Sequence, residues 1–252
     1  MKSLTGKIVA VIGGSSGMGR ATALALAHEG AAVVVGARRA ELCAQVVAEI
    51  EAHGGRAHAM PLDATDERSV ADFFADLERR FGRLDGAFNN VGRTLGSSPT
   101  TETTLERFQQ TLDFNLRSTF LCLREELRLM QRTGGGSIVN NSSIGGTRGF
   151  ANLQDYCAAK WGVVGLTKAV ALEGAAAGIR VNVIAPGLIA TERFELIRSQ
   201  NSAMIESRLK EIPLGRPGAM DEIGATVVWL LGRGSGFLTG AIIPIDGGEC
   251  AR

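Results

Sequence analysis

The chain has 252 residues with a formal net charge of +1; 45% of its residues are hydrophobic and 21% are charged. That length allows one large α/β domain or two small ones, and it can bury a substantial core without metal or disulfide staples. The near-zero charge gives no electrostatic basis for nucleic acid or an anionic membrane as the main partner.

The cysteines and histidines indicate neither a disulfide framework nor a metal site. The four cysteines lie far apart and show no CxxC or Cys/His ligand spacing, so we expect reduced thiols in a cytoplasmic protein. The three histidines form no plausible ligand group, and we expect no metal. We also expect no signal peptide and no membrane span, because no apolar run is long enough.

From the N-terminus onward, short apolar runs alternate with longer segments of helical spacing. Strand-like runs are found at 7–12, 31–37, 55–65, 84–92, 137–141, 178–187 and 240–248. Helices are predicted within 13–30, 38–54, 66–82, 104–132, 156–178 and 221–232, with a weakly anchored helical stretch at 191–212. Such alternation predicts an α/β fold with a parallel sheet covered on both faces. No linker or repeat breaks the series, so we expect a single domain over 1–252.

The first predicted strand ends in a glycine-rich turn, GGSSGMG, at residues 13–19. Gly13, Gly17 and Gly19 are spaced GxxxGxG, which differs from the GxGxxG dinucleotide fingerprint but relies on the same physics. Glycines let the backbone approach a pyrophosphate, and the following helix N-terminus offers unpaired N–H groups. The alternative is a tight β–α turn that binds nothing; the position between strand and helix favours phosphate binding.

The end of the second predicted strand indicates which dinucleotide binds. A fold that prefers NAD places a carboxylate there to hold the ribose diol. This chain instead has GARR at 36–39 and no acid before Glu41. The forks of Arg38 and Arg39 suit a 2′-phosphate, and no carboxylate is present to repel it. We therefore expect NADP(H), with NAD(H) less favoured; the alternative is two solvated arginines at the start of a helix.

The only tyrosine of the chain, Tyr156, precedes Lys160 by four residues in a predicted helix, so both side chains should share one face. A lysine charge at ~4 Å and an effective dielectric of ~20 is worth about 4 kcal/mol, or roughly three pKa units. That would bring the phenol close to neutral pH and to the range of a general acid/base. Ser143 follows the strand 137–141 and should lie at the mouth of the sheet. Alone, the pattern also fits a solvated lysine and a tyrosine at the core edge.

Taken together, the separated motifs resemble the short-chain dehydrogenase/reductase family over the full length of the chain. The matching pieces are GGSSGMG (13–19), NNVG (89–92), Asn115 in DFNLRSTF, Ser143, YCAAK (156–160), PGLIAT (186–191) and DGG (246–248). The resemblance implies a Rossmann-type doubly wound parallel sheet of about seven strands. It also implies an oxidoreductase that interconverts a ketone or aldehyde and an alcohol by hydride transfer.

The resemblance further implies roles for four catalytic residues. Tyr156 would exchange a proton with the substrate oxygen as the general acid/base. Lys160 would hold the nicotinamide ribose hydroxyls and keep the phenol acidic. Ser143 would hydrogen-bond the substrate oxygen, with Ser142 a structural neighbour, and Asn115 would support a water chain from Lys160 to solvent.

Cofactor-binding positions are implied in the same way. The glycine turn would line the pyrophosphate, with Ser15 and Arg38 near the 2′-phosphate and Asp63 at the adenine. Ile189 and Thr191 match positions that hold the nicotinamide carboxamide. The full set is Gly13, Ser15, Gly17, Met18, Gly19, Arg38, Arg39, Asp63, Ala64, Asn90, Gly92, Tyr156, Lys160, Pro186, Gly187, Ile189 and Thr191.

The chain departs from the family pattern at a few positions. Ile12 replaces a threonine before the glycines, and Asn141 replaces an apolar residue in the strand before Ser143; neither change removes a catalytic atom. The segment 230–240 is glycine-rich where the family often has an aspartate, so we expect a looser loop there. Asn89 is expected to be structural, tying the central strands together.

The family resemblance places the substrate pocket after Asn90, after Ser143 and in a substrate-loop region at 191–212, and it leaves the substrate itself open. These segments contribute Arg93, Leu95, Gly145, Gly146, Phe150, Leu153, Leu188, Phe194 and Met204. One hypothesis is that Arg93 and Arg148 meet an anionic group of the substrate; the alternative is solvated loop charges.

The leading interpretation is an NADP(H)-dependent carbonyl reductase or alcohol dehydrogenase, with an NAD-dependent alcohol dehydrogenase as a variant. A protein that senses NADP(H) without turnover would not need the catalytic set, and a nucleic-acid or membrane-associated protein is disfavoured by the charge. The resemblance also suggests a homotetramer. The helices around 104–131 and 155–177 would form one interface, and the last helix and strand another.

Overall fold

The structure is a computed structural model that describes residues 2–251. Seven strands form one sheet in the order β3-β2-β1-β4-β5-β6-β7, and all neighbouring strands are parallel. The strands are β1 (Ile8–Ile12), β2 (Ala32–Ala37), β3 (Arg56–Pro61), β4 (Gly86–Asn89), β5 (Gly136–Asn141), β6 (Ile179–Pro186) and β7 (Ile242–Ile245). The predicted parallel sheet of about seven strands is therefore confirmed.

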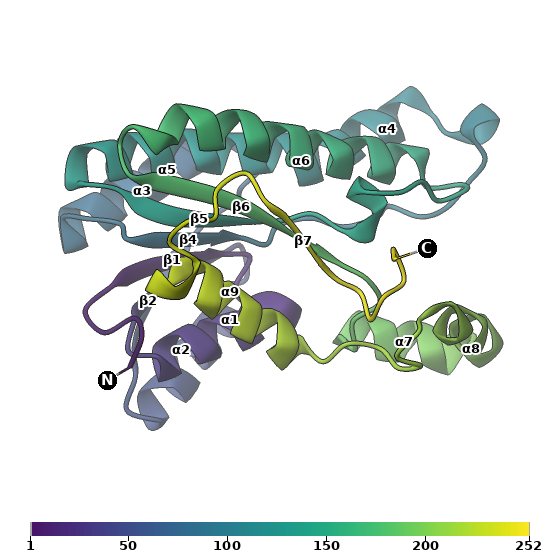
Figure 1. Ribbon diagram of the computed structural model, residues 1–252, viewed down its shortest axis with the longest axis horizontal. Coiled ribbons are helices and arrows are strands. Elements are labelled where there is room, and N and C mark those ends of the chain that lie inside the picture. The colour runs from purple at the N-terminus through teal and green to yellow at the C-terminus, as the bar shows by residue number, and fades with distance from the viewer. Residues whose placement is uncertain (1, 252) are drawn as a thin grey trace.

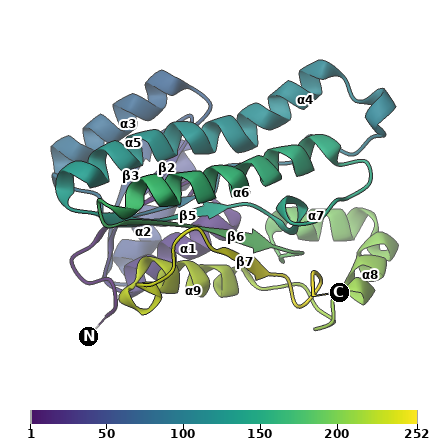
Figure 2. The same cartoon turned by 45° about the horizontal axis from the view of Figure 1, so that its top comes forward.

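Helices cover both faces of this sheet (Figure 1). They are α1 (Gly17–His28), α2 (Ala40–Ala52), α3 (Glu67–Phe81), α4 (Leu105–Leu112), α5 (Ser118–Thr133), α6 (Gln154–Ala175), α7 (Glu192–Gln200), α8 (Ser202–Glu211) and α9 (Met220–Leu231). Helices α3, α5 and α6 pack on one face, and α1, α2 and α9 pack on the other (Figure 2). The alternation of elements predicts the parallel sheet covered on both faces, and the doubly wound arrangement is the Rossmann type that the family resemblance implies.

The central strands are covered by helices on both faces, which explains why their sequences are continuous apolar runs. In β1, Val9 and Val11 pack toward α1 and α9, whereas Ala10 and Ile12 pack toward α3 and α5. Because both faces are covered, four of the five residues of β1 are buried, Ile8 is half-buried, and no polar alternation remains. Burying each valine stabilises the fold by about 1.5–3 kcal/mol relative to leaving it exposed.

The strand order fixes where a ligand can bind. The chain winds from β1 outward to β3, then returns to the other side of β1 with β4. Ligands of open α/β sheets bind outside the carboxyl ends of the strands at this switch point. The loops after β1 and β4 therefore frame the candidate site.

The helix predicted over 104–132 is confirmed, but it is not α-helical throughout. It consists of α4, a π-helical turn at Asp113–Arg117 and α5. Such turns widen the helix by one residue and are frequent at functional sites. The widened turn contains Asn115, which is fully buried.

The expectation of a loose loop at 230–240 is wrong. The Arg180 guanidinium in β6 donates to the carbonyl oxygens of Leu230 and Ser235 at 2.8 and 2.9 Å, and to that of Leu238 at 3.1 Å. Asn182 Nδ2 also donates to the Leu238 carbonyl oxygen at 2.9 Å. These hydrogen bonds tie the glycine-rich segment to β6.

The α7–α8 segment follows β6 in the chain and buries few side chains. In α7 only Phe194 is buried, and in α8 only Ile205 is buried. This agrees with the prediction of weak anchoring at 191–212. No helix within residues 2–251 is long and apolar enough to cross a membrane.

Candidate active site

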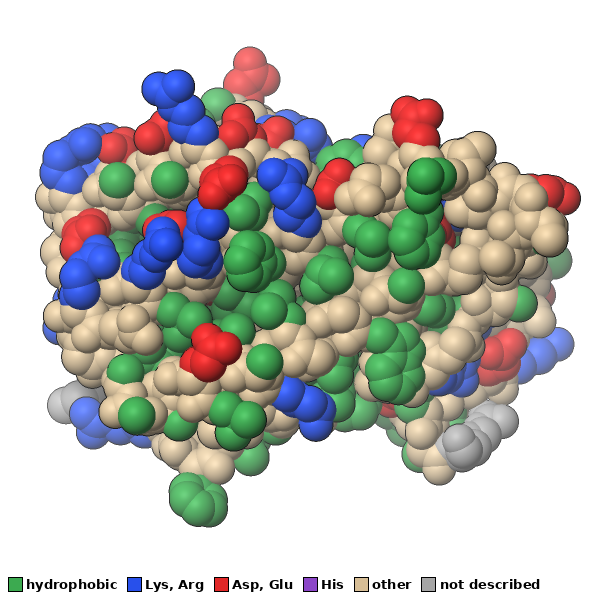
Figure 3. All heavy atoms as spheres, turned by 90° about the horizontal axis from the view of Figure 1, so that it is seen from above, with side chains coloured by type: hydrophobic (Ala, Val, Ile, Leu, Met, Phe, Trp, Pro, Cys, Tyr) green, Lys and Arg blue, Asp and Glu red, His purple; other side chains and the backbone are tan. Residues whose placement is uncertain are grey.

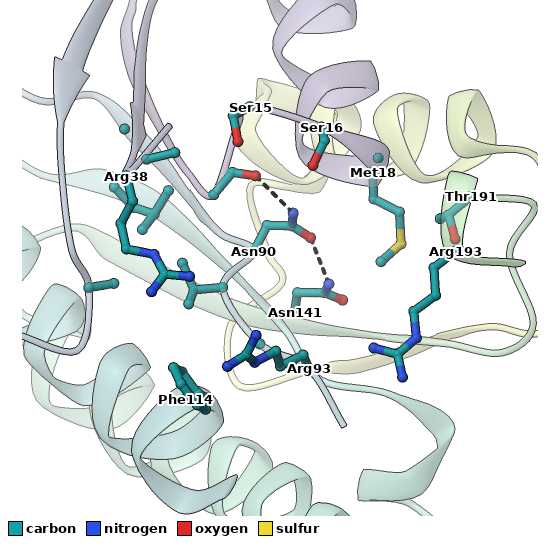
Figure 4. Close-up of a pocket in the computed structure, with 18 of the residues that line it drawn as sticks. Ser15, Ser16, Met18, Arg38, Asn90, Arg93, Phe114, Asn141, Thr191 and Arg193 are labelled. Carbon is teal, nitrogen blue, oxygen red and sulfur yellow. Dashed lines mark hydrogen bonds between the residues drawn. The ribbon is translucent and has the colours of Figure 1, made fainter. Parts of the chain in front are cut away.

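A cavity of about 420 Å³ lies at the carboxyl ends of the central strands. Most of the residues predicted to bind the cofactor line it, together with three of the four catalytic candidates. They are Gly13, Ser15, Gly17, Met18, Arg38, Arg39, Asp63, Ala64, Asn90, Gly92, Ser143, Tyr156, Lys160, Pro186, Gly187 and Thr191. Figure 4 shows side chains from the first glycine turn, the β2 end, the β4 end and α7 arranged around this space.

Three predicted residues do not line the cavity. A Cβ atom at Gly19 would collide with the carbonyl oxygen of Gly13, so the close packing within the turn requires glycine at this position. The side chain of Ile189 is buried in the apolar cluster beneath α9, and its backbone pairs with Gly218. The prediction that Ile189 helps to hold the nicotinamide carboxamide stays a prediction, and only the backbone of Ile189 would be free to do so, because its side chain is buried in that cluster. Asn115 lies behind Gly92.

The first turn has the backbone geometry that phosphate binding requires. Gly13 and Gly17 have φ values of 78° and 55°, in the left-handed region that favours glycine. Helix α1 begins at Gly17, so its unpaired N–H groups and the positive end of its dipole open on the cavity. Asn90 Nδ2 donates to the Gly13 carbonyl oxygen at 3.3 Å and links the turn to the β4 end (Figure 4).

The two arginines at the β2 end behave differently. Arg39 Nη2 donates to Ser16 Oγ at 2.7 Å and to Ser15 Oγ at 3.2 Å. Arg38 extends into the cavity (Figure 4). Burial would raise the pKa of Asp63, but hydrogen bonds from Thr65 and the Arg38 charge leave this pKa below its ordinary value. The end of β2 itself carries Ala37, not an acid.

Lys160 is a buried cation at the base of the site. Its residue is 3% exposed, and its Nζ donates to the carbonyl oxygen of Asn141 at 2.9 Å. Burial lowers the pKa of Lys160 to about 8. The Nζ atom lies 5.7 Å from the centroid of the Tyr156 ring, on the shared face of α6 that the four-residue spacing predicts.

The predicted direction of the Tyr156 pKa shift is wrong. Burial raises the pKa of this phenol above its ordinary value, and a hydrogen bond with Ser143 opposes that rise. The cation that lowers the pKa is Arg193 in α7, not Lys160, whose ammonium is directed to the Asn141 carbonyl. Reasoning from spacing alone omitted the desolvation of the phenol, which is the larger effect here.

The two adjacent serines make different contacts. Ser143 Oγ faces Tyr156 and accepts a hydrogen bond from the Gly145 N–H at 3.1 Å. Ser142 Oγ instead donates to the carbonyl oxygen of Lys160 at 2.9 Å and fixes the α6 backbone. This supports the prediction that Ser142 is structural.

Asn115 is positioned by the π-helical turn. Its Nδ2 donates to the carbonyl oxygens of Arg93 and Thr111 at 2.9 and 2.8 Å, while its buried Oδ1 has no hydrogen-bond partner within residues 2–251. A Cβ atom at Gly92 would stand 2.5 Å from this Oδ1 and 3.0 Å from Lys160 Nζ. The unpaired oxygen and the ammonium therefore flank the same small space beside Gly92.

Beneath the site, Asn89 joins β4 to β5, as predicted. Its Nδ2 donates to Asn140 Oδ1 at 2.9 Å and to Glu126 Oε2 at 3.0 Å. Glu126 is fully buried, and burial raises its pKa to about 8. Glu126 was not predicted as a site residue. The signal that could have identified it is an acidic residue at a position of the 104–132 helix pattern where an apolar residue is expected.

The substrate side of the cavity differs from the prediction. Of the nine substrate-pocket candidates only Arg93 lines the cavity, with its guanidinium 4.2 Å from the Phe114 ring centroid. The hypothesis that Arg148 meets the substrate is not supported, because Arg148 Nη2 lies 2.6 Å from Glu249 Oε1, outside the cavity. Arg193 lines the cavity and was missed, since position 193 carries no motif. Among the residues described, no group of three or more His, Cys, Asp and Glu could hold a metal.

Comparison with known proteins agrees with this geometry. The family model described as Enoyl-(Acyl carrier protein) reductase matches residues 12–249. Levodione reductase of Leifsonia aquatica is 39% identical over 254 residues, which cover 98% of this chain and 95% of that protein. A 2,5-dichloro-2,5-cyclohexadiene-1,4-diol dehydrogenase of Sphingobium indicum is 39% identical over 253 residues, 100% of both chains.

A solved structure shows the same fold with a cofactor. A crystal structure from Agrobacterium tumefaciens with bound NADP superimposes with a TM-score of 0.91 at 35% identity. The match covers 99% of this chain and 98% of that chain.

Proposed function

Because the chain belongs to the short-chain dehydrogenase/reductase family, we propose that it interconverts a ketone or aldehyde and an alcohol with NADP(H), using Tyr156 as the general acid/base. The family acts on CH–OH and C=O groups, so the chain is an oxidoreductase of this type. The observation that carries the proposal is that Tyr156, Ser143 and Lys160 line one cavity with the glycine turn.

The residues present fit a dinucleotide with a 2′-phosphate. The turn at Gly13 and Gly17 and the N-terminus of α1 would hold the pyrophosphate. Arg38 and Arg39 would hold the 2′-phosphate, Asp63 the adenine, and Lys160 the nicotinamide ribose. When bound, the nicotinamide supplies or accepts the hydride.

The preference for NADP(H) rests on the charge at the β2 end. Arg38 has its guanidinium in the cavity, and Ala37 supplies no carboxylate for a ribose diol. A charge-assisted hydrogen bond is worth about 1.5–3 kcal/mol, or about 10- to 100-fold in affinity. We expect Arg38→Ala to weaken NADPH binding by that factor and to leave NADH binding unchanged. Nicotinamide fluorescence measures both, and tighter binding of NADH than NADPH by the unmodified protein would overturn the preference.

In the direction of reduction, Tyr156 must carry a proton that it can give to the substrate oxygen. Its raised pKa keeps the phenol protonated near neutral pH, which suits donation. Ser143, hydrogen-bonded to the phenol, would bind the same oxygen and orient it. In the oxidative direction the phenol must lose its proton, so turnover of an alcohol should rise with pH.

Lys160 and Asn115 would restore that proton. The space beside Gly92 is flanked by the Lys160 ammonium and by the unpaired Asn115 Oδ1. A buried amide oxygen without a partner is rare, and a water molecule there would satisfy it. Such a water would link the ammonium to Asn115, whose Nδ2 donates to the carbonyl oxygen of Arg93 at the border of the cavity.

The test is turnover of a ketone panel with NADPH by Tyr156→Phe and by the serine pair. We expect Tyr156→Phe to lower kcat by about 10²–10⁴-fold with NADPH affinity retained. Ser143→Ala should lose far more activity than its neighbour Ser142→Ala, which removes only the bond to the Lys160 carbonyl. Full activity of Tyr156→Phe would refute the mechanism, and NADPH binding without turnover by the unmodified protein would favour a sensor.

We also propose a homotetramer. Large apolar side chains are exposed on α5 and α6 at Phe120, Trp161 and Leu172, and near α9 at Trp229 and Phe237. Figure 3 shows green side chains gathered on the face that α5 and α6 form. Light scattering should give four times the 26.5 kDa chain mass, and Leu172→Glu should lower it. A monomer mass for the unmodified protein would refute this assembly.

A further inference from the structure

We propose that Arg193 binds a carboxylate on the substrate, so that the enzyme acts on ketones and alcohols that carry an anionic group. This inference rests on the proposed function, because it names the substrate class of the same site. It revises the sequence-based hypothesis that Arg93 and Arg148 meet an anionic group of the substrate, with Arg193 in place of Arg148.

Arg193 reaches the catalytic end of the cavity from α7. In Figure 4 its side chain descends from α7 toward the loop after β4. Its Nη2 donates to Thr94 Oγ1 at 2.9 Å, and the residue lines the same cavity as Tyr156 and Ser143. Its charge is close enough to Tyr156 to lower the pKa of the phenol. A group on the substrate that extends from the reacting carbon toward α7 would meet this guanidinium.

The other arginines of the α7–α8 segment are paired with carboxylates. Arg198 lies 3.7 Å from Glu195, and Arg208 lies 2.8 Å from Glu249. Arg193 forms no ion pair with any carboxylate within residues 2–251. Glu192 also borders the cavity, but its Oε2 is 3.5 Å from the position of a Cβ at Gly17, at the glycine turn.

The chemistry of the fork favours an anion over a neutral group. A guanidinium has five N–H donors in one plane and matches a carboxylate through two parallel hydrogen bonds. Here the Thr94 hydroxyl accepts a hydrogen bond from the Arg193 guanidinium. Because this hydroxyl is neutral, it does not compensate the positive charge of Arg193. A substrate carboxylate would supply both the second acceptor and the counter-charge.

The alternative is a purely structural role for Arg193, in which its hydrogen bond with Thr94 only holds α7 against the loop after β4. Thr94→Val removes that bond and keeps the charge, whereas Arg193→Met removes both. The two variants therefore form a matched pair.

The experiment compares 3-oxocyclohexane-1-carboxylate with its methyl ester as substrates, with NADPH. We expect the unmodified enzyme to have a kcat/KM at least tenfold higher for the carboxylate, and Arg193→Met to bring this ratio to about one, chiefly by slowing the acid. Thr94→Val should keep the ratio and Arg193→Lys should retain part of it. An unmodified enzyme without a preference for the acid, or an equal loss on both substrates in Arg193→Met, would overturn the proposal.

A binding measurement separates failure of this inference from failure of the proposed function. Calorimetry with the NADP⁺ complex measures the affinity of the unreactive cyclohexanecarboxylate. We expect Arg193→Met to weaken it at least tenfold, with the affinity for NADP⁺ unchanged. Loss of turnover on all ketones with this result intact would refute the reaction and keep the anion site. Equal affinities in the two proteins would refute the anion site alone.

Discussion

The site has two sides that are held by different kinds of contact. On the buried side, Lys160 and Asn115 are 3% and 0% exposed, and their side chains donate to backbone carbonyl oxygens. On the α7–α8 side, only Phe194 and Ile205 are buried. The remaining ties of α7–α8 are largely side-chain hydrogen bonds and ion pairs, such as Arg208 with Glu249.

This difference separates the reaction from the recognition of the substrate. Backbone partners cannot be substituted, so the buried side fixes the position of the groups that we propose to transfer the proton. Ion pairs whose cation is partly exposed to solvent, such as Arg208 with Glu249, contribute only about 1 kcal/mol, and segments that rely on them open easily. The α7–α8 side can therefore vary its side chains, and with them the substrate, without disturbing the chemistry.

The largest effect should come from the buried acid beneath the site. The pKa of Glu126 is about 8 in the fold against 4.5 ordinarily, so the native state holds a proton that the unfolded chain releases between these values. Stability should therefore fall as pH rises through that window. The shift of 8 − 4.5 = 3.5 units corresponds to at most about 5 kcal/mol. Glu126→Gln should remove this slope.

Urea unfolding between pH 5 and pH 8 measures the slope. The upper limit matters because Lys160, with its pKa lowered to about 8, adds stability as the pH rises further. Glu106→Gln, at an exposed position of α4, is the control and should keep the slope of the unmodified protein. Identical pH profiles for Glu126→Gln and the unmodified protein would show that Glu126 does not titrate in this window.

The second-largest effect should come from adding a methyl group to the buried side of the site at Gly92. A Cβ at Gly92 would stand 2.5 Å from Asn115 Oδ1 and 3.0 Å from Lys160 Nζ, so one of them must move. Misplacing a catalytic group by about 1 Å can lower the rate about 100-fold, equivalent to roughly 3 kcal/mol. We expect Gly92→Ala to lower kcat by about that factor, measured by steady-state kinetics.

Gly96 offers a matched control for that variant. Its φ is 130°, close to the 152° of Gly92, but a Cβ there would meet no atom within 4 Å. Gly96→Ala therefore adds comparable backbone strain without the collision. If both variants lost the same activity, strain and not the position of Lys160 would explain the loss.

Most of the buried side could be predicted from the sequence. Tyr156 and Lys160 share a helix face by spacing, and the end of β5 brings Ser143 to them, so local geometry is sufficient. The sign of the Tyr156 pKa shift could not be predicted, because it depends on how much water the fold removes from the phenol. Glu126 was missed for a similar reason, since its partner Asn89 is 37 positions away.

The α7–α8 side was predicted poorly. Arg148 and Arg193 are both arginines near a predicted substrate loop, and nothing in the sequence distinguishes them. The fold pairs Arg148 with Glu249, which lies 101 positions along the chain, and directs Arg193 into the cavity. Side-chain partners set by tertiary packing are not encoded in local spacing, whereas strand ends and helix faces are.

The smallest effect should appear where Glu249 ties α8 to the rest of the chain. Its fully buried side chain accepts from Arg148 and Arg208 at 2.6 and 2.8 Å. Glu249→Gln keeps the shape and removes the charge; because both arginines are partly exposed, the cost should be about 1 kcal/mol. This corresponds to roughly fivefold more frequent opening of α7–α8.

Limited trypsin digestion measures this opening and should show cleavage after Arg198 and Arg208 accelerated by that factor. The control is Glu195→Gln, which breaks only the exposed ion pair with Arg198 and should leave cleavage after Arg208 unchanged. If both variants accelerated cleavage after Arg208 equally, α8 would be held by the charges of the α7–α8 segment itself and not by Glu249.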